Sequence, residues 1–343
     1  MARRPRLTIT AGTRLGPYEV LAPLGAGGMG EVYRARDTRL GREVALKVVA
    51  ARHGEDQDAL RRFAREAKIA ARLTHPNVCT LFDADTDGAV AYVVLELLDG
   101  ETLAARIARG PIPEEEARRI GAEVARGLAR AHGLGFVHRD LKPQNVFLTA
   151  TGAKILDFGL ARSGPASAAD HDETASLLTE AGLLLGTVGY MAPEQLRGEP
   201  PAAAADLWAL GCVLYECLAG RRTFAGRSAQ EAFAATLTSP PDWSALPAGI
   251  SSATRSVLQR LLDKDPATRL ADAAAVEHEL SAGPGSPGRE AVPAAPRRRA
   301  ALRAAAIGAA LLGFAAFWFA RTERAPIDSL AVLPFSSAGS DAD

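Results

Sequence analysis

The sequence has few cysteines, and their spacing does not indicate a site. Cys79, Cys212 and Cys217 are the only three among 343 residues, and none belongs to a CxxC pair. An odd, widely spaced set is neither a disulfide framework nor the ligand pattern of structural zinc. Cys212 and Cys217 are five residues apart in a predicted helix, so they face different directions. We expect three small buried side chains, with no disulfide and no structural zinc.

The sequence also lacks an excess of charge of one sign. Lys plus Arg number 40, Asp plus Glu number 40, and the first 280 residues contain no basic stripe with interleaved aromatic residues. We therefore expect no nucleic-acid partner. The N-terminal residues 1–12 are basic but lack the apolar run of a signal peptide, so the segment that follows is expected to start in the cytosol.

Apolar residues are plentiful enough for one large core. Hydrophobic residues make up 48% of the chain and charged residues 23%, which is typical of a chain that folds around a soluble core. Residues 18–50 hold three β-rich runs, YEVLAPL, EVYRARD and EVALKVVA, separated by AGGMG and RLG. Residues 56–73 follow a helical period, and the apolar run VAYVVLELL at 90–98 predicts a buried strand.

From about residue 101 the pattern becomes mostly helical. Residues 117–131 are typical of a long amphipathic helix, and residues 206–219 of an apolar helix that ends at Gly220. Ser228, followed three residues later by Glu231, has the spacing of a capping box at the start of another helix. The sequence therefore predicts an α+β protein with a small β-rich lobe followed by a larger helical lobe.

The first motif with chemical meaning is the glycine-rich run from Gly25 to Gly30. Glycines let backbone amides approach phosphate oxygens where a Cβ would collide. The same pattern suits a dinucleotide-binding turn that opens a helix, but here a predicted strand follows, which disfavours that alternative. A second strand contains Lys47. A buried lysine needs a partner, and Glu66 on the next predicted helix is the candidate.

The second motif is HRDLKPQN at residues 138–145, followed by Asp157-Phe158-Gly159. Transfer of a phosphoryl group from ATP needs a carboxylate that accepts the hydroxyl proton, oxygen ligands for a metal, and cations over the phosphates. Asp140 can be the first of these, and Asn145 and Asp157 offer the hard oxygen donors that Mg²⁺ prefers. Lys47 and Lys142 can be the cations.

Together these motifs resemble the eukaryotic-like (Hanks-type) protein kinases, especially their bacterial membrane-bound serine/threonine branch. The resemblance covers residues 18 to about 280 and includes GTVGYMAPE at 186–194, DLWALG at 206–211 and Arg269. It implies a two-lobed protein kinase fold that uses ATP with Mg²⁺, or with Mn²⁺ in its place, to phosphorylate serine and threonine hydroxyls of proteins.

The resemblance also implies a role for each matched residue. Asp140 would be the catalytic base, Lys142 would steady the γ-phosphate, Lys47 would orient the other phosphates and pair with Glu66, and Asn145 and Asp157 would hold the metal. Leu95 would be the gatekeeper, and Glu96 and Leu98 would present backbone groups to adenine. The remaining nucleotide-binding residues implied are Leu24, Gly25, Gly27, Gly28, Gly30, Val32, Ala45 and Phe147.

Other matched residues are expected to be structural. His138 is interpreted as a packing residue and not as a base, Asp206 as a partner of the catalytic-loop backbone, and Glu194 and Arg269 as a buried ion pair. Lys142 and Thr187 resemble the serine/threonine branch at the catalytic and substrate-binding loops. Thr174, Ser176 and Thr179 are candidate autophosphorylation sites between Asp157 and Glu194, and solvated loop hydroxyls are the alternative interpretation.

The C-terminal part suggests a membrane anchor. Residues 282–299 combine a Pro/Gly/Ala-rich linker with three consecutive arginines, and the apolar run 300–320 that follows is interrupted only by Arg303. At 1.5 Å per residue this run would span roughly 31 Å as a helix, close to the thickness of a bilayer core. A buried soluble helix or a basic amphipathic tail would give a similar pattern. We interpret the run as a transmembrane helix, with the arginine-rich side in the cytoplasm.

These interpretations divide the chain into a tail, a kinase domain, a linker, a membrane helix and a further segment. The boundaries are 1–17, 18–281 (lobes 18–98 and 99–281), 282–299, 300–320 and 321–343, the last being the expected start of a truncated extracytoplasmic segment. We expect a single-pass protein of the inner cell membrane that signals across it and dimerises for autophosphorylation in trans. A pseudokinase scaffold and a small-molecule phosphotransferase are the alternatives, although all of the catalytic residue types are present and the GTVGYMAPE motif resembles a platform for peptide substrates.

Overall fold

The structure is a computed structural model that describes residues 9–27, 30–50, 67, 69–88, 90–158, 188–200, 202–226, 228–270 and 272–282. The chain divides into two units, residues 1–288 and 289–343. All of the described residues belong to the first unit.

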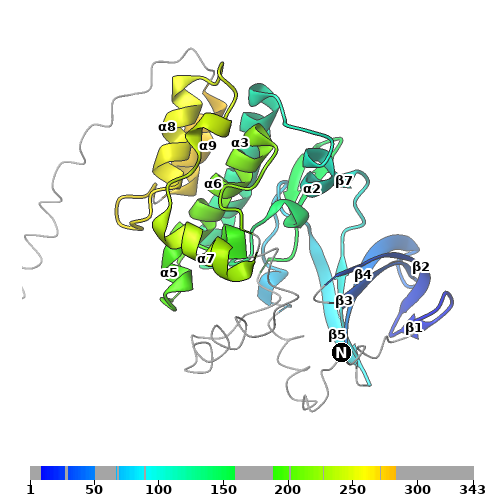
Figure 1. Cartoon of the computed structure of the whole chain (residues 1–343). Coiled ribbons are helices and arrows are strands. Elements are labelled where there is room, and N and C mark those ends of the chain that lie inside the picture. The colour runs from blue at the N-terminus through cyan, green and yellow to red at the C-terminus, as the bar shows by residue number, and fades with distance from the viewer. Residues whose placement is uncertain are drawn as a thin grey trace, which may run out of the picture. The chain divides into compact units, whose positions relative to one another are not determined.

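The N-terminal part of the first unit is an antiparallel sheet (Figure 1). Its described strands are ordered β1-β2-β3-β4-β6-β5, and their bounds are β1 (Arg14–Leu15), β2 (Tyr18–Gly27), β3 (Gly30–Asp37), β4 (Arg42–Ala50), β5 (Leu81–Asp87) and β6 (Val90–Leu95). The three β-rich runs predicted between residues 18 and 50 are confirmed as β2, β3 and β4. A tight turn joins β3 to β4, where the buried carboxylate of Asp37 accepts hydrogen bonds from the amides of Arg39 and Leu40.

The alternation of side chains in β4 decides which face of the sheet can meet a ligand. Val44, Leu46 and Val48 point into an apolar cluster with β2, β3 and β6. Successive residues of a strand point to opposite faces, so Ala45 and Lys47 share the other face. The register pairs Ala45 with Leu95 and Lys47 with Val32. The sheet therefore presents a lysine, flanked by small and apolar side chains, on the face away from that cluster.

The predicted strand at 90–98 was correct only in part, because β6 ends at Leu95. At Glu96 the chain leaves the ladder. The Glu96 amide still donates to the Thr80 carbonyl, but the Glu96 carboxylate accepts from the Thr80 amide and pairs with Lys154. Glu96 is the one charged residue in the apolar run, and the strand ends immediately before it, where polar partners distant in sequence hold the chain.

The C-terminal part of the first unit is mainly helical, as predicted (Figure 1). The described helices are α2 (Leu103–Ile107), α3 (Glu114–Gly133), α5 (Pro193–Leu196), α6 (Ala203–Ala219), α7 (Ala229–Thr238), α8 (Ser252–Leu261) and α9 (Ala273–Ser281). Short 3₁₀ turns are η1 (Pro143–Asn145), η2 (Val188–Tyr190) and η3 (Trp243–Ala245), and a small antiparallel sheet contains β7 (Glu101–Thr102), β8 (Val146–Thr149) and β9 (Gly152–Ile155).

The helix α6 is the centre of this lobe. It is apolar on most sides, and its residues Trp208, Leu210 and Leu214 are fully buried. The amphipathic helix α3 packs against both α6 and α9. The predicted end of α6 is confirmed, because Gly220 is its C-cap with a left-handed φ of 67°. The predicted start of α7 is confirmed as well, since the Ser228 hydroxyl accepts from the Glu231 amide. These helices form the rigid base on which the site is built.

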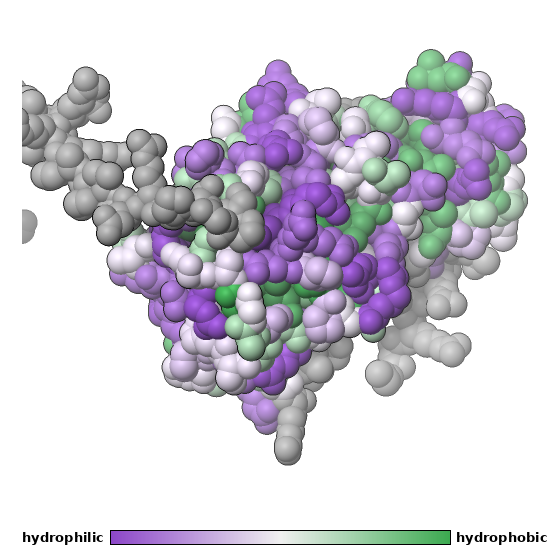
Figure 2. All heavy atoms as spheres, turned by 90° about the horizontal axis from the view of Figure 1, so that it is seen from above, coloured by the Kyte–Doolittle hydropathy of each residue, from purple (hydrophilic) through white to green (hydrophobic). Residues whose placement is uncertain are grey.

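The surface of the first unit is mostly polar in the view of Figure 2, with apolar residues in small groups. All three cysteines are free, and Cys212 and Cys217 are buried while Cys79 is partly exposed. Residues 67, 69 and 70 of the helix predicted at 56–73 are helical, and residues 51–66 and 68 lie outside the described residues. The predicted end at Leu73 is wrong, because residues 71 and 72 form a turn and residue 73 is not helical. None of the helices in the described ranges has the length and apolar character needed to cross a bilayer. The predicted membrane helix at 300–320 lies outside those ranges.

Candidate active site

The side chain of Lys47 links the sheet to the helical lobe. Lys47 is 6% exposed, and its Nζ lies 2.8 Å from Oδ2 of Asp157, which follows β9. A buried ammonium group is costly without a counter-charge, and Asp157 supplies one. The partner predicted from the sequence, Glu66, lies outside the described residues. The pair with Asp157 brings together two of the predicted site residues that are far apart in the chain.

Asp140 lies in a compact group of polar side chains. Lys142 places its Nζ 2.8 Å from Oδ2 and 3.1 Å from Oδ1 of Asp140. The amide nitrogen of Asn145, at the end of η1, donates to the Asp140 carbonyl at 2.8 Å and to Oδ2 at 3.2 Å. Since the Asn145 nitrogen is used in this way, its amide oxygen is directed away from Asp140. Three of the predicted catalytic and metal-binding residues therefore share one local network.

Asp206 on α6 fixes the backbone of the loop that carries Asp140. Its carboxylate is 1% exposed and accepts hydrogen bonds from the amides of His138 and Arg139, each at 2.8 Å. The predicted role of Asp206 is thereby confirmed. Arg139 has a positive φ of 67°, a conformation that costs a non-glycine residue about 1–3 kcal/mol unless its surroundings hold it. The buried carboxylate holds this strained peptide immediately before Asp140.

Contacts with the same loop also position the chain immediately before Asp157. The amide of Leu156 donates to the Asn145 carbonyl at 2.8 Å, and the ring nitrogen Nε2 of His138 lies 2.8 Å from the Leu156 carbonyl. The His138 ring also packs edge-on against Phe158, with 4.9 Å between ring centroids. His138 is thus a packing and hydrogen-bonding residue, as interpreted from the sequence. These contacts join five predicted site residues into one continuous network: Lys47, Asp140, Lys142, Asn145 and Asp157.

A family model, the protein kinase domain, matches residues 18–281. The chain belongs to the protein kinase family. Curated relatives include the serine/threonine-protein kinase PknB of Mycobacterium leprae, 39% identical over 270 residues that cover 77% of this chain and 42% of that protein. Another is the serine/threonine-protein kinase PknD of Mycobacterium tuberculosis, 38% identical over 266 residues that cover 76% of this chain and 39% of that protein.

A solved structure supports the same fold for this kinase. The crystal structure of the Mycobacterium tuberculosis PknI kinase domain, a cysteine-to-alanine mutant, is similar with a TM-score of 0.62 and 28% sequence identity. The match covers 80% of this chain and 98% of that one. The predicted protein kinase fold, with a β-rich first lobe and a helical second lobe, is therefore confirmed. The kinase spans about two fifths of the length of the curated relatives named above.

Most of the described residues predicted to bind the nucleotide lie on β2, β3 or β4 of the first sheet, and β4 is the strand that carries Lys47. In β2 and β3, Gly25 pairs with Val32 and Gly27 with Gly30, while Leu24 is exposed. Ala45 is buried in β4 beside Leu95. Phe147 is on β8, where its ring edge would lie 3.3 Å from a Cβ placed on Gly100. Phe147 therefore lies next to the segment that follows Glu96 and Leu98.

The segment that carries Glu96 is tied to β9 by interactions that the sequence did not predict. Nζ of Lys154 lies 3.0 Å from Oε2 of Glu96, and the Cys79 amide donates to the Ile155 carbonyl at 2.8 Å. The thiol of Cys79 lies 3.8 Å from the Glu96 carbonyl, and burial raises the pKa of this thiol to about 12. This thiol is therefore un-ionised at neutral pH.

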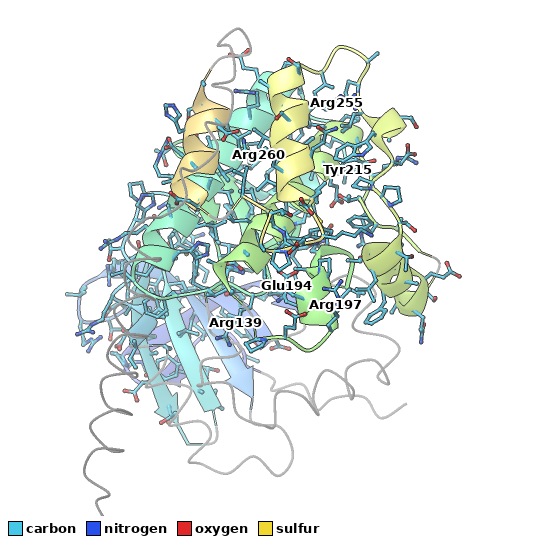
Figure 3. The ribbon with its side chains drawn as sticks, turned by 90° about the vertical axis from the view of Figure 1, so that its left-hand side faces the viewer. Arg139, Glu194, Arg197, Tyr215, Arg255 and Arg260 are labelled. Carbon is cyan, nitrogen blue, oxygen red and sulfur yellow. The ribbon has the colours of Figure 1, made fainter. Side chains whose placement is uncertain are left out.

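The helical lobe contributes a buried ion pair and a small pocket next to the site. Arg269 and Glu194 form the predicted buried ion pair, with 2.6 Å between Nη1 and Oε1, and it fixes α5. Figure 3 shows Glu194 and Arg197 on α5, with Arg139 at the end of the helical lobe nearest the strands. A small pocket opens beside Asp140. Its lining residues are Arg139, Asp140, Leu141, Tyr190, Met191, Gln195, Ala205, Asp206 and Ala209.

Several predicted site residues lie outside the described residues. They are Gly28, Glu66, Gly159, Thr174, Ser176, Thr179 and Thr187. Sequence analysis also missed two residues that the structure brings to the network, His132, which contacts Asp206, and Lys154. The sequence does contain a pattern that could have predicted the position of Lys154. Its neighbours Ala153 and Ile155 are apolar and buried, and side chains alternate along a strand, so residue 154 must point to the opposite face. For His132 the sequence shows only that the residue lies on an amphipathic helix, which does not predict its contact with Asp206.

Proposed function

We propose that this kinase transfers the γ-phosphate of Mg·ATP to serine and threonine hydroxyls of proteins. The observation that carries the proposal is the network in which Asp140 contacts Lys142 and Asn145, while Lys47 contacts Asp157. Phosphoryl transfer depends mainly on positioning and electrostatic stabilisation. The network supplies one proton acceptor, two cations and two oxygen donors.

Asp140 is the proton acceptor in this proposal. The substrate hydroxyl oxygen forms a bond to the γ-phosphorus as the bond from that phosphorus to the bridging oxygen breaks, and ADP leaves. The hydroxyl proton passes to the Asp140 carboxylate. Lys142, which already contacts both carboxylate oxygens of Asp140, is close enough to pair with the γ-phosphate. Lys47 offers its ammonium group to the remaining phosphates from β4.

The side chains of Asn145 and Asp157 fit a divalent metal. The amide nitrogen of Asn145 is engaged by Asp140, which leaves its oxygen as the free donor atom. Asp157 adds a partly exposed carboxylate, and an all-oxygen donor set of this kind suits Mg²⁺. When bound, the metal neutralises charge on the phosphates. Asn145 and Asp157 would hold it, and Lys47 would keep Asp157 oriented.

The preference for serine and threonine is supported by the similarity to serine/threonine-protein kinases and by Lys142 in the DLKPQN sequence. The experiment is incubation of the purified chain with radiolabelled ATP, Mg²⁺ and a generic protein substrate, followed by phosphoamino-acid analysis. We expect phosphoserine and phosphothreonine, and no incorporation after chelation with EDTA. Label on tyrosine alone, or the absence of label with added Mg²⁺, would overturn the proposal.

Autophosphorylation in trans is part of the proposal and is tested separately. Thr174, Ser176 and Thr179 are the candidate sites, with Thr179 eight residues before Thr187. An inactive Asp140→Asn chain is mixed with active chain of different mass and analysed by mass spectrometry. Phosphate in the 174–179 segment of the inactive chain supports transfer between two copies. An unmodified segment in both chains, in a preparation that phosphorylates other proteins, would overturn it.

We also propose that residues 300–320 anchor the kinase in the inner cell membrane with its catalytic domain in the cytoplasm. The length of the apolar run and the arginines at 297–299 support this proposal. The chain and a variant that lacks 300–320 are expressed in bacteria and fractionated after carbonate washing. The chain should remain with the membranes and the variant should be soluble. Recovery of both in the soluble fraction would overturn the anchor without affecting the proposed activity.

A further inference from the structure

Tyr190 connects the small pocket beside Asp140 to Arg222, on the loop that follows α6. Tyr190 lines that pocket together with Asp140 and is 4% exposed. The guanidinium carbon of Arg222 lies 5.9 Å from the centroid of the Tyr190 ring. A guanidinium over an aromatic face is attracted by the negative charge of that face. Arg222 is half-buried, so part of the residue remains accessible at the surface next to the pocket.

The loop that carries Arg222 is fixed on both sides. Gly220 is the C-cap of α6, and the Thr223 hydroxyl donates to a carbonyl of the same helix at 3.3 Å. Phe224 is 2% exposed and stacks on Trp208, with 5.4 Å between the ring centroids. Because its neighbours are held against α6, the backbone at Arg222 has a defined position relative to the pocket.

The carboxylates in and beside the pocket already have partners. The Tyr190 hydroxyl donates to Oε2 of Glu216 at 2.5 Å, and burial raises the pKa of Glu216 above its ordinary value. Asp140 contacts Lys142 at 2.8 Å. Asp206 is 1% exposed and accepts two backbone amides. These three carboxylates therefore contribute less negative potential to the surface than exposed carboxylates would.

Two arginines lie close to the pocket. Arg139 is one of its lining residues, and Arg222 packs over the ring of Tyr190, which is another. In the proposed reaction the substrate hydroxyl must reach Asp140, so the peptide that carries it passes this pocket. A substrate side chain a few residues from that hydroxyl can then meet Arg222. A guanidinium pairs best with a carboxylate, which it binds through two parallel hydrogen bonds.

We propose that Arg222 is a specificity-determining residue that recognises an acidic side chain of the protein substrate near the phosphorylated serine or threonine. The substrates of this kinase are then acidic peptide segments. This inference rests on the proposed function, because it concerns the peptide whose hydroxyl reaches Asp140. The contact with Tyr190 limits the directions in which the Arg222 guanidinium can point, so the acidic residue must stand at a particular distance from the acceptor.

The test uses peptides with a single threonine among neutral residues. One series carries a glutamate at each of about five positions on either side of the threonine, because an extended chain spans about 3.3 Å per residue and this range reaches about 17 Å. Parallel series carry alanine or lysine at the same positions. Arg222→Gln removes the charge under test. Arg221→Gln is the matched control, since the exposed Arg221 pairs with Asp242 and its loss changes the net charge equally.

The measurements are kcat/KM of the full chain for each peptide, relative to the alanine peptide, and the melting temperature of each variant. We expect the unsubstituted chain to prefer glutamate at a particular position by about 10-fold, the scale of a hydrogen bond to a charged group. Arg222→Gln should lose most of this preference through a higher KM for the glutamate peptide, and Arg221→Gln should keep it. Arg222→Glu should prefer lysine at the same position.

The inference would be overturned by an unsubstituted chain with no preference for glutamate, or by Arg222→Gln with an unchanged preference. An equal loss in Arg221→Gln would also overturn it, because net charge alone would then explain the effect. A purely structural role of Arg222 would lower the melting temperature and leave the preference unchanged.

A second pair of variants decides if Arg222→Gln does not fold. Arg222→Lys keeps the charge but cannot form two parallel hydrogen bonds, so its preference for glutamate should fall about threefold, whereas Arg221→Lys should keep the full preference. Equal preferences in the two lysine variants would contradict the inference. Failure of the proposed function itself would appear instead as absence of transfer to every peptide by the unsubstituted chain.

Discussion

Nζ of Lys47 on β4 lies 2.8 Å from Oδ2 of Asp157, the residue that β9 delivers to the site. The two residues are on different lobes, Lys47 on β4 of the N-terminal sheet and Asp157 just after β9. Their contact holds the proposed phosphate-binding cation beside one proposed metal ligand. It also explains how a lysine that is 6% exposed is tolerated in the sheet.

Substitution of Lys47 tests this relationship. Lys47→Met removes the cation and leaves Asp157 without its partner, so kcat/KM for ATP should fall at least about 100-fold, the scale of lost electrostatic stabilisation at an active site. Lys47→Arg should also have a low kcat/KM for ATP, because a planar guanidinium does not replace a compact ammonium. Steady-state kinetics with varied ATP is the measurement. A kcat/KM within threefold for Lys47→Met would contradict the role given to this residue.

The buried pair of Glu194 and Arg269 should dominate the stability of the helical lobe. Arg269 also donates to the Asp263 and Ala204 carbonyls, and its guanidinium lies 5.1 Å from the Trp208 ring centroid. Removal of one partner leaves an uncompensated buried charge, so Glu194→Gln and Arg269→Met should each lower the free energy of unfolding by about 3–5 kcal/mol. Urea denaturation of the kinase gives these values.

The double variant separates the charge from the packing. With both charges removed, Glu194→Gln with Arg269→Met should lose less than the sum of the two single losses, because no isolated charge remains. If the double variant loses as much free energy of unfolding as the two single variants together, the two side chains do not act as a pair.

Gly100 should tolerate no side chain. It has a φ of 137°, and an added Cβ would lie 2.0 Å from the Leu148 carbonyl oxygen and 3.3 Å from the Phe147 ring. Gly100→Ala should therefore lower stability by about 2–4 kcal/mol through backbone strain and overlap together, and should raise the KM for ATP because the segment after Leu98 must move.

Gly110→Ala is the matched control for backbone strain alone. Gly110 has a similar φ of 124°, but no atom lies within 4 Å of its added Cβ. Its loss should be about 1–3 kcal/mol, the cost of strain without overlap, with the KM for ATP unchanged. Equal losses for the two glycines would show that the contact with β8 is unimportant.

The pKa of Glu114 predicts how the stability of the protein depends on pH. Burial acts to raise its pKa, but hydrogen bonds from Ser251 and Thr254 outweigh burial and hold the pKa below its ordinary value. A lowered pKa in the folded state gives stability that is present above the unfolded pKa and lost as the pH falls through the folded pKa. Glu114→Gln should therefore cost about 1–2 kcal/mol at pH 7 and less at pH 4.

The measurement is urea denaturation of both proteins at the two pH values, with Glu115→Gln, an exposed neighbour, as control. The control shows the effect of removing one exposed carboxylate from the same turn of α3. A difference between Glu114→Gln and the unsubstituted chain that grows toward pH 4 would contradict the sign of the pKa change.

Motif spacing was enough to name most residues of the candidate site and to predict the order of the two lobes, because each motif is local. Gly25, Lys47, Asp140, Asn145 and Asp157 could all be found in this way, since phosphate chemistry restricts which residue types can serve. The structure adds the pairs that these residues make. Lys47 meets Asp157 across 110 positions of sequence, and no periodicity in either strand encodes that contact.

Polar partners distant in sequence account for the rest of what was missed. The end of β6 at Leu95 depends on Glu96 bonding to Thr80 and Lys154, and the only sign of it in the apolar run is the charge of Glu96 itself. His132 has a side chain that could equally face solvent or core at its helical position. Its contact with Asp206 arises only when α3 packs against α6.

The measurement that tests the central claim most directly is the comparison of ATP affinity and turnover in Asp140→Asn. Asparagine preserves the shape of the side chain and cannot take a proton from the substrate. The account predicts a kcat at least about 100-fold lower, as expected when a general base is removed, with the dissociation constant for ATP changed little. A turnover equal to that of the unsubstituted chain would contradict it.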